Sequence, residues 1–486
     1  MTPTPGEVAP TVDAARAREL AARPRLSPLE QFLRLFTEVR PGEGLTAICM
    51  FANVFLILCA YYFVKPLRDG WIAVSDVRGL SSVEVKAYTS FAQSLVLIGG
   101  VALYGRLVTR WPRRELITWT TLFCISNLLV FWSLRAAQVA GAGVAFYIWV
   151  GIFGLFVVSQ FWAFAADLYG DERGRRLLPM IAIGATAGAV TGSFIAKTLV
   201  RSGVLDASAL LLAALLPLTA SIALTAFADS RGPAGEGSGL PRRAAAAVDD
   251  AGADRGGALS LVRRHPYLLA VAAVTLLTHW VSTNGDNLLF RTVQEAIRHD
   301  LSTRPDLSVE AAKSFVRDGT TAFYGSFFFW VNICALGLQA FAASRLLRYG
   351  GFGLILLLLP VIALAGYTLM AFLPILLVVR VLKTAENSVS YSINNTAQQV
   401  LWLPTTAEMK YKAKPAVETF CVRVGDGLAA TTVLIGVRFY ALSTPLLFLF
   451  NVALVCVWLF VAATVVRGYA RIRVEAPAEV AGKGPP

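Results

Sequence analysis

Six polar side chains fall on one face of an expected helix over residues 375–402, a segment that is otherwise largely apolar. At about 100° per residue they lie within about 60° of one line. The members are Arg380, Lys383, Asn387, Tyr391, Asn394 and Gln398. Cations beside amides and a phenol suit an anionic, hydrogen-bonding ligand, and such a row cannot face lipid. We predict that it lines a water-filled cavity and binds substrate; hydrogen bonds between packed helices are the alternative.

A second candidate set ends the first apolar segment. Lys65 and Arg68 flank Pro66, and a proline removes a backbone donor and is expected to break the helix. The two cations would then stand at the opening of the cavity and contact substrate. An interfacial aromatic belt with a lysine that extends toward water would give the same pattern without a ligand.

Residues 282–287 read Ser-Thr-Asn-Gly-Asp-Asn inside another apolar segment. Amides, a glycine and a carboxylate in such a place predict an unwound, hinge-like stretch. Asp286 is then a candidate for coupling or protonation, and a polar cap at the outer end of the helix is equally compatible. His279, one turn earlier, is interpreted as a hydrogen-bonded core residue.

A later apolar segment carries Glu418, Arg423 and Asp426. Glu418 and Arg423 are five residues apart and face different sides, so a pair between them is poor. Ion pairs with other helices and contacts to a ligand are equally compatible. We assign Arg423 to substrate binding, and Glu418, Asp426 and the Glu386 carboxylate to the coupling or protonation candidates beside Asp286.

The composition places these side chains in a membrane. Of 486 residues, 56% are hydrophobic and 15% charged, and the mean hydropathy is +0.61; a soluble domain carries roughly 25% charged residues. We predict an all-α protein with twelve transmembrane helices in two duplicated six-helix halves within a lipid bilayer. The apolar windows are 45–64, 88–109, 115–134, 143–166, 178–200, 207–227, 265–290, 320–343, 352–373, 375–402, 414–440 and 445–466.

The expected organisation is set by these windows. Its parts are an N-terminal tail over 1–44, a first half over 45–227, a flexible polar linker over 228–264, a second half over 265–466 with an outer helical cap over 291–318, and a C-terminal tail over 467–486. About 28 Lys and Arg residues lie on the side of the termini and linker, and about 13 on the other, which predicts that both termini are cytoplasmic. Loop arginines account for the net charge of +13, so nucleic acid is not an expected partner.

Several chemistries have no motif in the sequence. It contains no phosphate-binding G-x-x-x-x-G-K-[ST], no H-E-x-x-H and no G-x-S-x-G, and its six cysteines stand singly. We therefore expect no metal, no cofactor and no enzymatic activity. A monomer is the expected state.

The second half repeats signals of the first. Basic residues come after the second and eighth windows at Arg106 and Arg345, and after the fourth and tenth at Arg175 and Lys412. The two separations, 239 and 237 residues, agree within two. Two six-helix halves joined by a cytoplasmic linker resemble the plan of the major facilitator superfamily.

Longer segments are similar to bacterial members of the ATP:ADP antiporter (nucleotide translocase) family. They are Tyr62-Phe63-Val64-Lys65-Pro66-Leu67-Arg68-Asp69-Gly70, Phe161-Trp162-Ala163-Phe164-Ala165-Ala166-Asp167, Asn394-Asn395-Thr396, Tyr411-Lys412-Ala413-Lys414 and Val424-Gly425-Asp426. The resemblance covers most of 45–466. It implies a facilitator-like bundle in the bacterial cytoplasmic membrane that exchanges ATP for ADP.

The function we predict is alternating-access transport of a nucleotide or related organic anion. Five candidate cations near the expected cavity face five acids, so a smaller or less charged substrate fits as well. Two alternatives stay open: proton-coupled export of another small molecule, which needs Asp286 or Glu386 exposed to the cavity, and a membrane scaffold or sensor that carries no cargo.

Overall fold

The computed structural model describes residues 27–34, 37–75, 77, 79–110, 113–202, 208–231, 255–406 and 409–481. These residues are almost entirely helical, which confirms the predicted all-α class. Ten of the described helices are long and apolar enough to cross a membrane. Most of the predicted tail 1–44 and of the predicted linker 228–264 lies outside the described residues.

The first six windows correspond to six long rods. After the short α2 (Pro28–Leu33) they are α3 (Gly44–Ala73), α4 (Ser82–Arg110), α5 (Arg113–Ala136), the two arms of α6 (Ala142–Arg201) and α7 (Ala209–Ser230). The arms of α6 meet at Gly170, whose φ of 62° is open to glycine at little steric cost. The first arm runs antiparallel to α3 and the second parallel to it, so the chain reverses at this glycine.

The last six windows correspond to six further rods, several of which contain π-helical segments, labelled η. The elements are α9 (Arg255–Arg264), α10 (Pro266–Ser302), α11 (Val309–Gly337), η1 (Leu338–Ala343), α12 (Ser344–Phe372), α13 (Leu376–Val389), η2 (Ser390–Asn394), α14 (Asn395–Val400), η3 (Met409–Ala413), α15 (Lys414–Ala416), η4 (Val417–Cys421), α16 (Val422–Leu434), η5 (Ile435–Phe439) and α17 (Thr444–Ala481). Part of the predicted C-terminal tail is therefore a continuation of α17.

Two local predictions are wrong. α3 continues through Pro66 to Ala73, since neighbouring groups can satisfy a backbone carbonyl that a proline leaves free inside a membrane helix. α10 is an unbroken helix across residues 282–287. Its polar side chains have partners on other helices: Asn284 donates to Asn451 Oδ1 at 3.0 Å and Thr283 donates to Asp426 Oδ1 at 2.7 Å. The backbone therefore stays helical.

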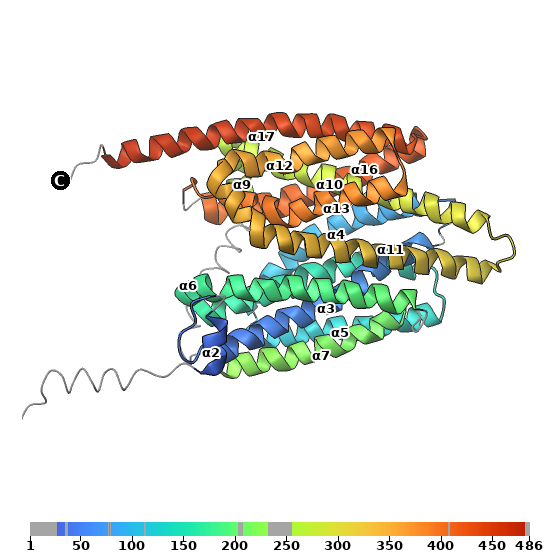
Figure 1. Cartoon of the computed structure of the whole chain (residues 1–486), viewed down its shortest axis with the longest axis horizontal. Coiled ribbons are helices and arrows are strands. Elements are labelled where there is room, and N and C mark those ends of the chain that lie inside the picture. Colours follow the sequence, from blue (N-terminus) through green and yellow to red (C-terminus); the bar gives the residue numbers. More distant parts are fainter. Residues whose placement is uncertain are drawn as a thin grey trace, which may run out of the picture.

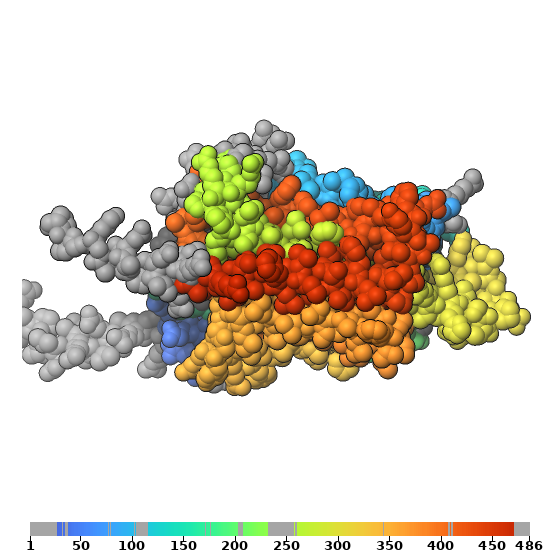
Figure 2. All heavy atoms as spheres, turned by 90° about the horizontal axis from the view of Figure 1, so that it is seen from above, coloured from blue at the N-terminus to red at the C-terminus, as the bar shows by residue number. Residues whose placement is uncertain are grey.

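The rods form two sets that lie side by side (Figure 1). The helices from α3 to α7 belong to one set and those from α10 to α17 to the other, and α4 and α11 lie where the sets meet. One hydrophobic core contains buried residues from Leu33 to Ala228 alone, and a second is formed mainly by residues from Val262 onward. The hairpin between α10 and α11 protrudes from the end of the bundle opposite the C-terminal end of α17 (Figures 1 and 2).

Glycines in the second arm of α6 form a flat packing face. A Cβ atom at Gly184, Gly188 or Gly192 would meet the backbone of α3, at the carbonyl groups of Phe51, Phe55 and Cys59 in turn. The two backbones therefore approach as closely as small-residue helix interfaces allow. This contact fixes α3, which carries Lys65 and Arg68, on a rigid neighbour.

The two sets are fastened to each other toward the hairpin end. At the start of α4, Ser82 Oγ accepts from Arg298 at 3.0 Å and Glu84 pairs with Arg438 at 3.8 Å. Near the end of α3, a Cβ atom on Gly70 would clash with Thr321 on α11. α4 and α11 therefore join the sets at this end of the bundle.

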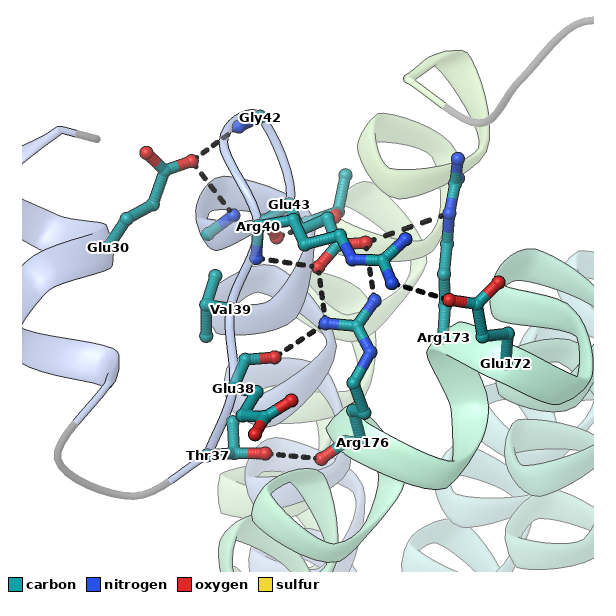
Figure 3. A network of polar contacts seen from close by, with 12 residues as sticks. Glu30, Thr37, Glu38, Val39, Arg40, Gly42, Glu43, Glu172, Arg173 and Arg176 are labelled. Atoms are coloured by element: carbon teal, nitrogen blue, oxygen red, sulfur yellow. Dashed lines mark hydrogen bonds and ion pairs between the residues drawn. The ribbon is translucent and has the colours of Figure 1, made fainter. Parts of the chain in front are cut away.

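At the opposite end, the chain before α3 is tied to the bend of α6 (Figure 3). Glu43 accepts from Arg176 at 3.1 Å and pairs with Arg173 at 3.6 Å, and Arg176 also donates to the Glu38 carbonyl at 2.6 Å. The Arg40–Glu172 pair is exposed and contributes little. The network holds the entry of α3 against the reversal between the two arms of α6.

Glu30 makes the stability of the segment before α3 depend on pH. Its carboxylate accepts backbone N–H groups of Ser27 and Gly42 at 2.8 and 2.6 Å, and hydrogen bonds to the charged form lower its pKa. The stabilisation is therefore present above the unfolded pKa and is lost as pH falls through the folded pKa. We expect Glu30→Gln to speed hydrogen exchange of residues 27–44 several-fold at neutral pH, and to match the wild type in acid after correction for intrinsic rates. Equal exchange at neutral pH would contradict this.

Candidate functional site

A cavity of 170 Å³ lies between the two sets of helices. The first set contributes lining residues from α3, α4 and α6, and the second from α10, α11 and α16. Its charged lining residues are Arg68, Asp69, Lys86, Asp286, Arg423 and Asp426. Three cations face three carboxylates, so the lining as a whole is neutral.

Asp69 is the centre of the charges from the first set. Its side chain is 1% exposed and pairs with Lys86 Nζ at 3.0 Å and with Arg68 Nη2 at 3.4 Å. The Arg68 guanidinium also lies 4.5 Å from the centroid of the Tyr147 ring, and the Lys86 ammonium lies 4.2 Å from that of Phe290. One buried carboxylate thus serves two cations, which leaves a local positive surplus.

On the opposite wall, Asp426 contacts polar side chains of α10 and α16. Arg423 pairs with it at 3.0 Å, Thr283 donates to it at 2.7 Å, and His279 Nδ1 lies 3.8 Å from it. Arg423 and Asp426 are both partly exposed and line the cavity.

A third ionic group lies deeper in the second set. The Lys383 ammonium is fully buried and touches two carboxylates, Glu386 at 2.9 Å and Asp286 at 3.1 Å. Tyr367 donates its hydroxyl to Glu386 at 2.8 Å, and Asn387 donates to Asp286 at 3.4 Å. Asp286 also lines the cavity, whereas Glu386 is buried behind it. Lys383 therefore already has two anionic partners inside the protein.

Lys65 lies in a different surrounding. Its ammonium is bounded by four aromatic rings, with centroids 5.6, 5.0, 4.2 and 5.8 Å away. These belong to Tyr61, Tyr62, Phe328 and Tyr391, two from each set of helices. Among the residues that the structure describes, no carboxylate lies within 4.0 Å of this ammonium. Cation–π contacts hold the charge, and an anion can still approach it.

Three donor atoms carried by lining residues are buried without a hydrogen-bond acceptor. They are Arg68 Nε, Asn287 Nδ2 and Tyr324 Oη. A buried donor left unpaired costs about 1–3 kcal/mol. The cavity wall thus favours an occupant that offers hydrogen-bond acceptors.

The remaining predicted residues are not part of the cavity lining. Arg380 donates to Ser326 Oγ at 2.8 Å, Asn394 is buried, Gln398 is partly buried, and Glu418 pairs with Lys414 at 3.8 Å. No side chain of the predicted polar row is part of the lining of this cavity, although Tyr391 is 41% exposed and contacts Lys65. The structure instead brings Arg68, Arg423, Asp286 and Asp426 together around it.

Sequence reasoning missed Lys86 as a functional residue. The apolar window that predicts its helix begins at residue 88, whereas α4 begins at Ser82 because Ser81 and Glu84 cap its first turn. A search for capping pairs before each window would have placed Lys86 inside the membrane helix. Tyr147 and Tyr324 carry no such signal, because their types are common on packed helices. Asn287 was noted only as part of the polar run 282–287.

Among the described residues, no group of three or more His, Cys, Asp or Glu side chains is arranged to hold a metal ion. The site is thus a set of paired charges, one lysine enclosed by aromatic rings, and unpaired donors, placed at the contact between two helical sets.

Three solved structures with which this chain shares its fold are transporters by name. The nucleoside transporter NupG is 13% identical, with a TM-score of 0.59, over 86% of this chain and 98% of that one. A POT family transporter in complex with 5-aminolevulinic acid is 11% identical, with a TM-score of 0.60, over 88% and 96%. The human organic anion transporter MFSD10 (TETRAN) is 15% identical, with a TM-score of 0.53, over 87% and 100%.

No family model matches the sequence, and a search of curated proteins gives no match. At these identities the likeness establishes the fold alone. The chain is an all-α, multi-pass membrane protein with a major facilitator-like fold, as the sequence predicts.

Proposed function

We propose that this chain is a secondary transporter that moves an anionic small molecule across the membrane by alternating access. The observation that carries the proposal is the polar cavity between the two sets of helices, beside a lysine that has no carboxylate partner among the described residues. The fold and the transporters that share it support the same conclusion. The six-helix halves over 45–227 and 265–466 are the two bodies that would move.

The volume of the cavity limits the size of cargo that it can hold in this conformation. Ligand pockets for drug-sized molecules measure about 300–1,000 Å³, so 170 Å³ is too small for a nucleotide. Cargo entry therefore requires the two sets to separate. The contacts of α4 and α11 lie at the hairpin end, which favours entry from the opposite end, where α2 and the C-terminal end of α17 lie.

The cargo is proposed to be a nucleotide or related organic anion. Lys65 and Arg68 on α3 and Arg423 on α16 would contact its anionic oxygens from opposite walls. Lys383 is not assigned to cargo binding, because its two carboxylate partners already neutralise its charge. Exchange of ATP-type for ADP-type nucleotides, a bacterial cytoplasmic membrane with both termini in the cytoplasm, and a monomeric state complete the proposal; the exchange and the membrane rest on the sequence resemblance.

A specific observation supports a second candidate. Each of the six charged groups that line the cavity has an ion-pair partner within the protein. A scaffold or sensor that carries no cargo would have such internal pairing. The two candidates differ at Lys65, since a scaffold has no use for a cation that is free to bind an anion.

Uptake into proteoliposomes tests the proposal. Labelled nucleotides and organic anions are presented outside, with and without the same compound inside, and trans cargo is expected to stimulate uptake. Lys65→Ala should lower kcat/KM by about 30-fold, the loss expected for one desolvated charge contact, whereas Lys65→Arg should retain part of the rate. Lys313→Ala, on the exposed hairpin, is the matched control. Flat uptake across the whole panel would favour the scaffold.

A further inference from the structure

The wall of the cavity that the first set of helices provides has an excess of positive charge. Arg68 on α3 and Lys86 on α4 share the single carboxylate of Asp69. Lys65, also on α3, lies 4.2 Å from the centroid of the lining ring of Phe328 and adds to the positive charge on this side. Anionic groups of a cargo are therefore attracted to this wall.

The wall that the second set provides has an excess of negative charge. Arg423 is matched by Asp426, so this pair adds no net charge. Asp286 shares the Lys383 ammonium with Glu386, so two carboxylates meet one cation. Over the lining residues and their ion-pair partners, with histidine counted as neutral, the excesses of the two walls are equal and opposite. The cavity therefore has a positive side and a negative side.

Asp286 is the lining carboxylate that remains open to an occupant. Its contacts with Lys383 and Asn387, at 3.1 and 3.4 Å, both fall on its Oδ1 atom. None of the residues that the structure describes donates a hydrogen bond to its Oδ2 atom, and the side chain is 48% exposed. In Asp69 and Asp426, by contrast, both carboxylate oxygens accept hydrogen bonds from side chains. A charged acceptor is thus available on the negative wall.

Donor atoms of the same lining are also unpaired. Asn287 and Tyr324 are each 4% exposed, and their Nδ2 and Oη atoms have no partner among the described residues. Arg68 Nε is likewise buried without an acceptor. A cargo that carries only anionic oxygens would supply acceptors for these donors, but it would bring no donor to Asp286.

We propose that the cargo is an amino acid-like anion, a small molecule that carries an ammonium group in addition to its carboxylate or phosphate. The inference rests on the proposed function, because it names the class of cargo for the same site. The ammonium donates a charge-assisted hydrogen bond to Asp286 Oδ2, and the anionic oxygens accept from Arg68 and Lys86 on the opposite wall. Such a molecule matches the direction of charge across the cavity. Its size also suits a volume of 170 Å³, which is too small for a nucleotide.

Binding of matched pairs of compounds tests the inference. The members of each pair differ in one amino group: γ-aminobutyrate and butyrate, glutamate and glutarate, aminoethyl phosphate and ethyl phosphate. Calorimetric titration of the purified protein should show that the amino member binds at least about tenfold more tightly, the difference that one hydrogen bond between charged groups provides. A hydroxyl group in place of the amino group, as in α-hydroxyglutarate, should lose most of this difference.

Variants of Asp286 identify the group that recognises the ammonium. Asp286→Asn should abolish the preference for the amino member, because asparagine keeps the shape of the side chain and removes its charge. Asp286→Glu, which keeps the carboxylate, should retain part of the preference. The control is Asp300→Asn, the same substitution at the half-exposed hairpin end of α10, which should leave the preference unchanged. The comparison within each pair on the wild type tests the inference even where a variant of Asp286 does not fold.

The outcomes separate this inference from the proposed function. Equal binding of both members of every pair, or a preference that persists in Asp286→Asn, overturns the inference. Uptake of nucleotides or other anions with no amino preference also overturns it and leaves the transporter standing. Binding of amino compounds that depends on Asp286, without uptake of any compound, overturns transport and keeps the binding site. Absence of both binding and uptake overturns both.

Discussion

Asp69→Asn is expected to destabilise the protein by about 3–5 kcal/mol, the usual cost of removing one partner from a buried ion pair. Asp69 is the only carboxylate within 4.0 Å of the buried Lys86 ammonium among the described residues, and it also pairs with Arg68. Asparagine keeps the shape but leaves two cations without their anion. Thermal unfolding in detergent, followed by circular dichroism, measures the loss.

A double variant separates charge from packing. Lys86→Met removes one of the stranded cations and keeps an apolar stem against Phe290, so Asp69→Asn with Lys86→Met should recover part of the stability. The control is Asp300→Asn, whose pair with Arg304 is half exposed and should matter by less than about 1 kcal/mol. If Asp69→Asn and Asp300→Asn melt alike, the buried group contributes nothing and our account of this wall is wrong.

Gly188→Leu is expected to prevent folding, and Gly188→Ala to destabilise the protein by about 3 kcal/mol. A Cβ atom at this position would overlap the carbonyl oxygen of Phe55 and lie 2.8 Å from its Cα atom. Backbone cannot move aside as a side chain can, so α3 and α6 must separate to admit the methyl group. Overpacking typically destabilises a protein by about 1–3 kcal/mol, and a clash with backbone lies at the upper end of that range. The yield of monodisperse protein and its melting temperature are the measurements.

Gly99→Ala is the matched control for this substitution. Gly99 is also within a helix, and a Cβ atom there would meet nothing within 4 Å. Alanine should leave stability unchanged or raise it by up to about 1 kcal/mol, the difference in helix propensity. Equal melting temperatures for the two alanine variants would show that the close approach of α3 and α6 is not needed.

The helices were predictable because twelve apolar windows of spanning length leave few other folds. The boundaries were less so: the segment before Ser82 is polar, and a hydropathy window ignores the capping pair of Ser81 and Glu84 that starts α4. The residues of the run 282–287 are poor helix formers in isolation. Partners on other helices, such as Asn451 and Asp426, reverse that preference and cannot be read from local sequence.

The types of residue in the site were predictable from the sequence, but which of these residues lie together was not. Lys65, Arg68, Arg423 and Asp286 were identified from charges in apolar segments. Whether a buried cation is free or paired depends on which helices meet. Lys383 and Lys65 look alike in sequence, yet one has two carboxylates and the other has four aromatic rings.

Part of the polar row over residues 380–398 is turned away from its expected line for a geometric reason. Arg380, Lys383 and Asn387 precede that turn, and they are held by Ser326, Glu386 and Asp286 instead. The prediction assumes about 100° per residue throughout, but residues 390–394 form the π-helical η2. A π turn contains one residue more than an α turn and rotates the next part of the helix by about 100°. Asn394 and Gln398 are therefore turned out of line with Arg380 and Asn387.

All five π-helical segments of the described residues lie between Leu338 and Phe439. Wide turns of this kind interrupt the regular ladder of backbone hydrogen bonds, and they are frequent at functional sites. The two sets of helices therefore differ in their backbones: among the described residues the first set has close glycine contacts and no π-helical segment, and the second contains all five π-helical segments. We expect the second set to bend at these wide turns as the two sets separate, which would shift Tyr391 on η2 relative to Lys65 on α3.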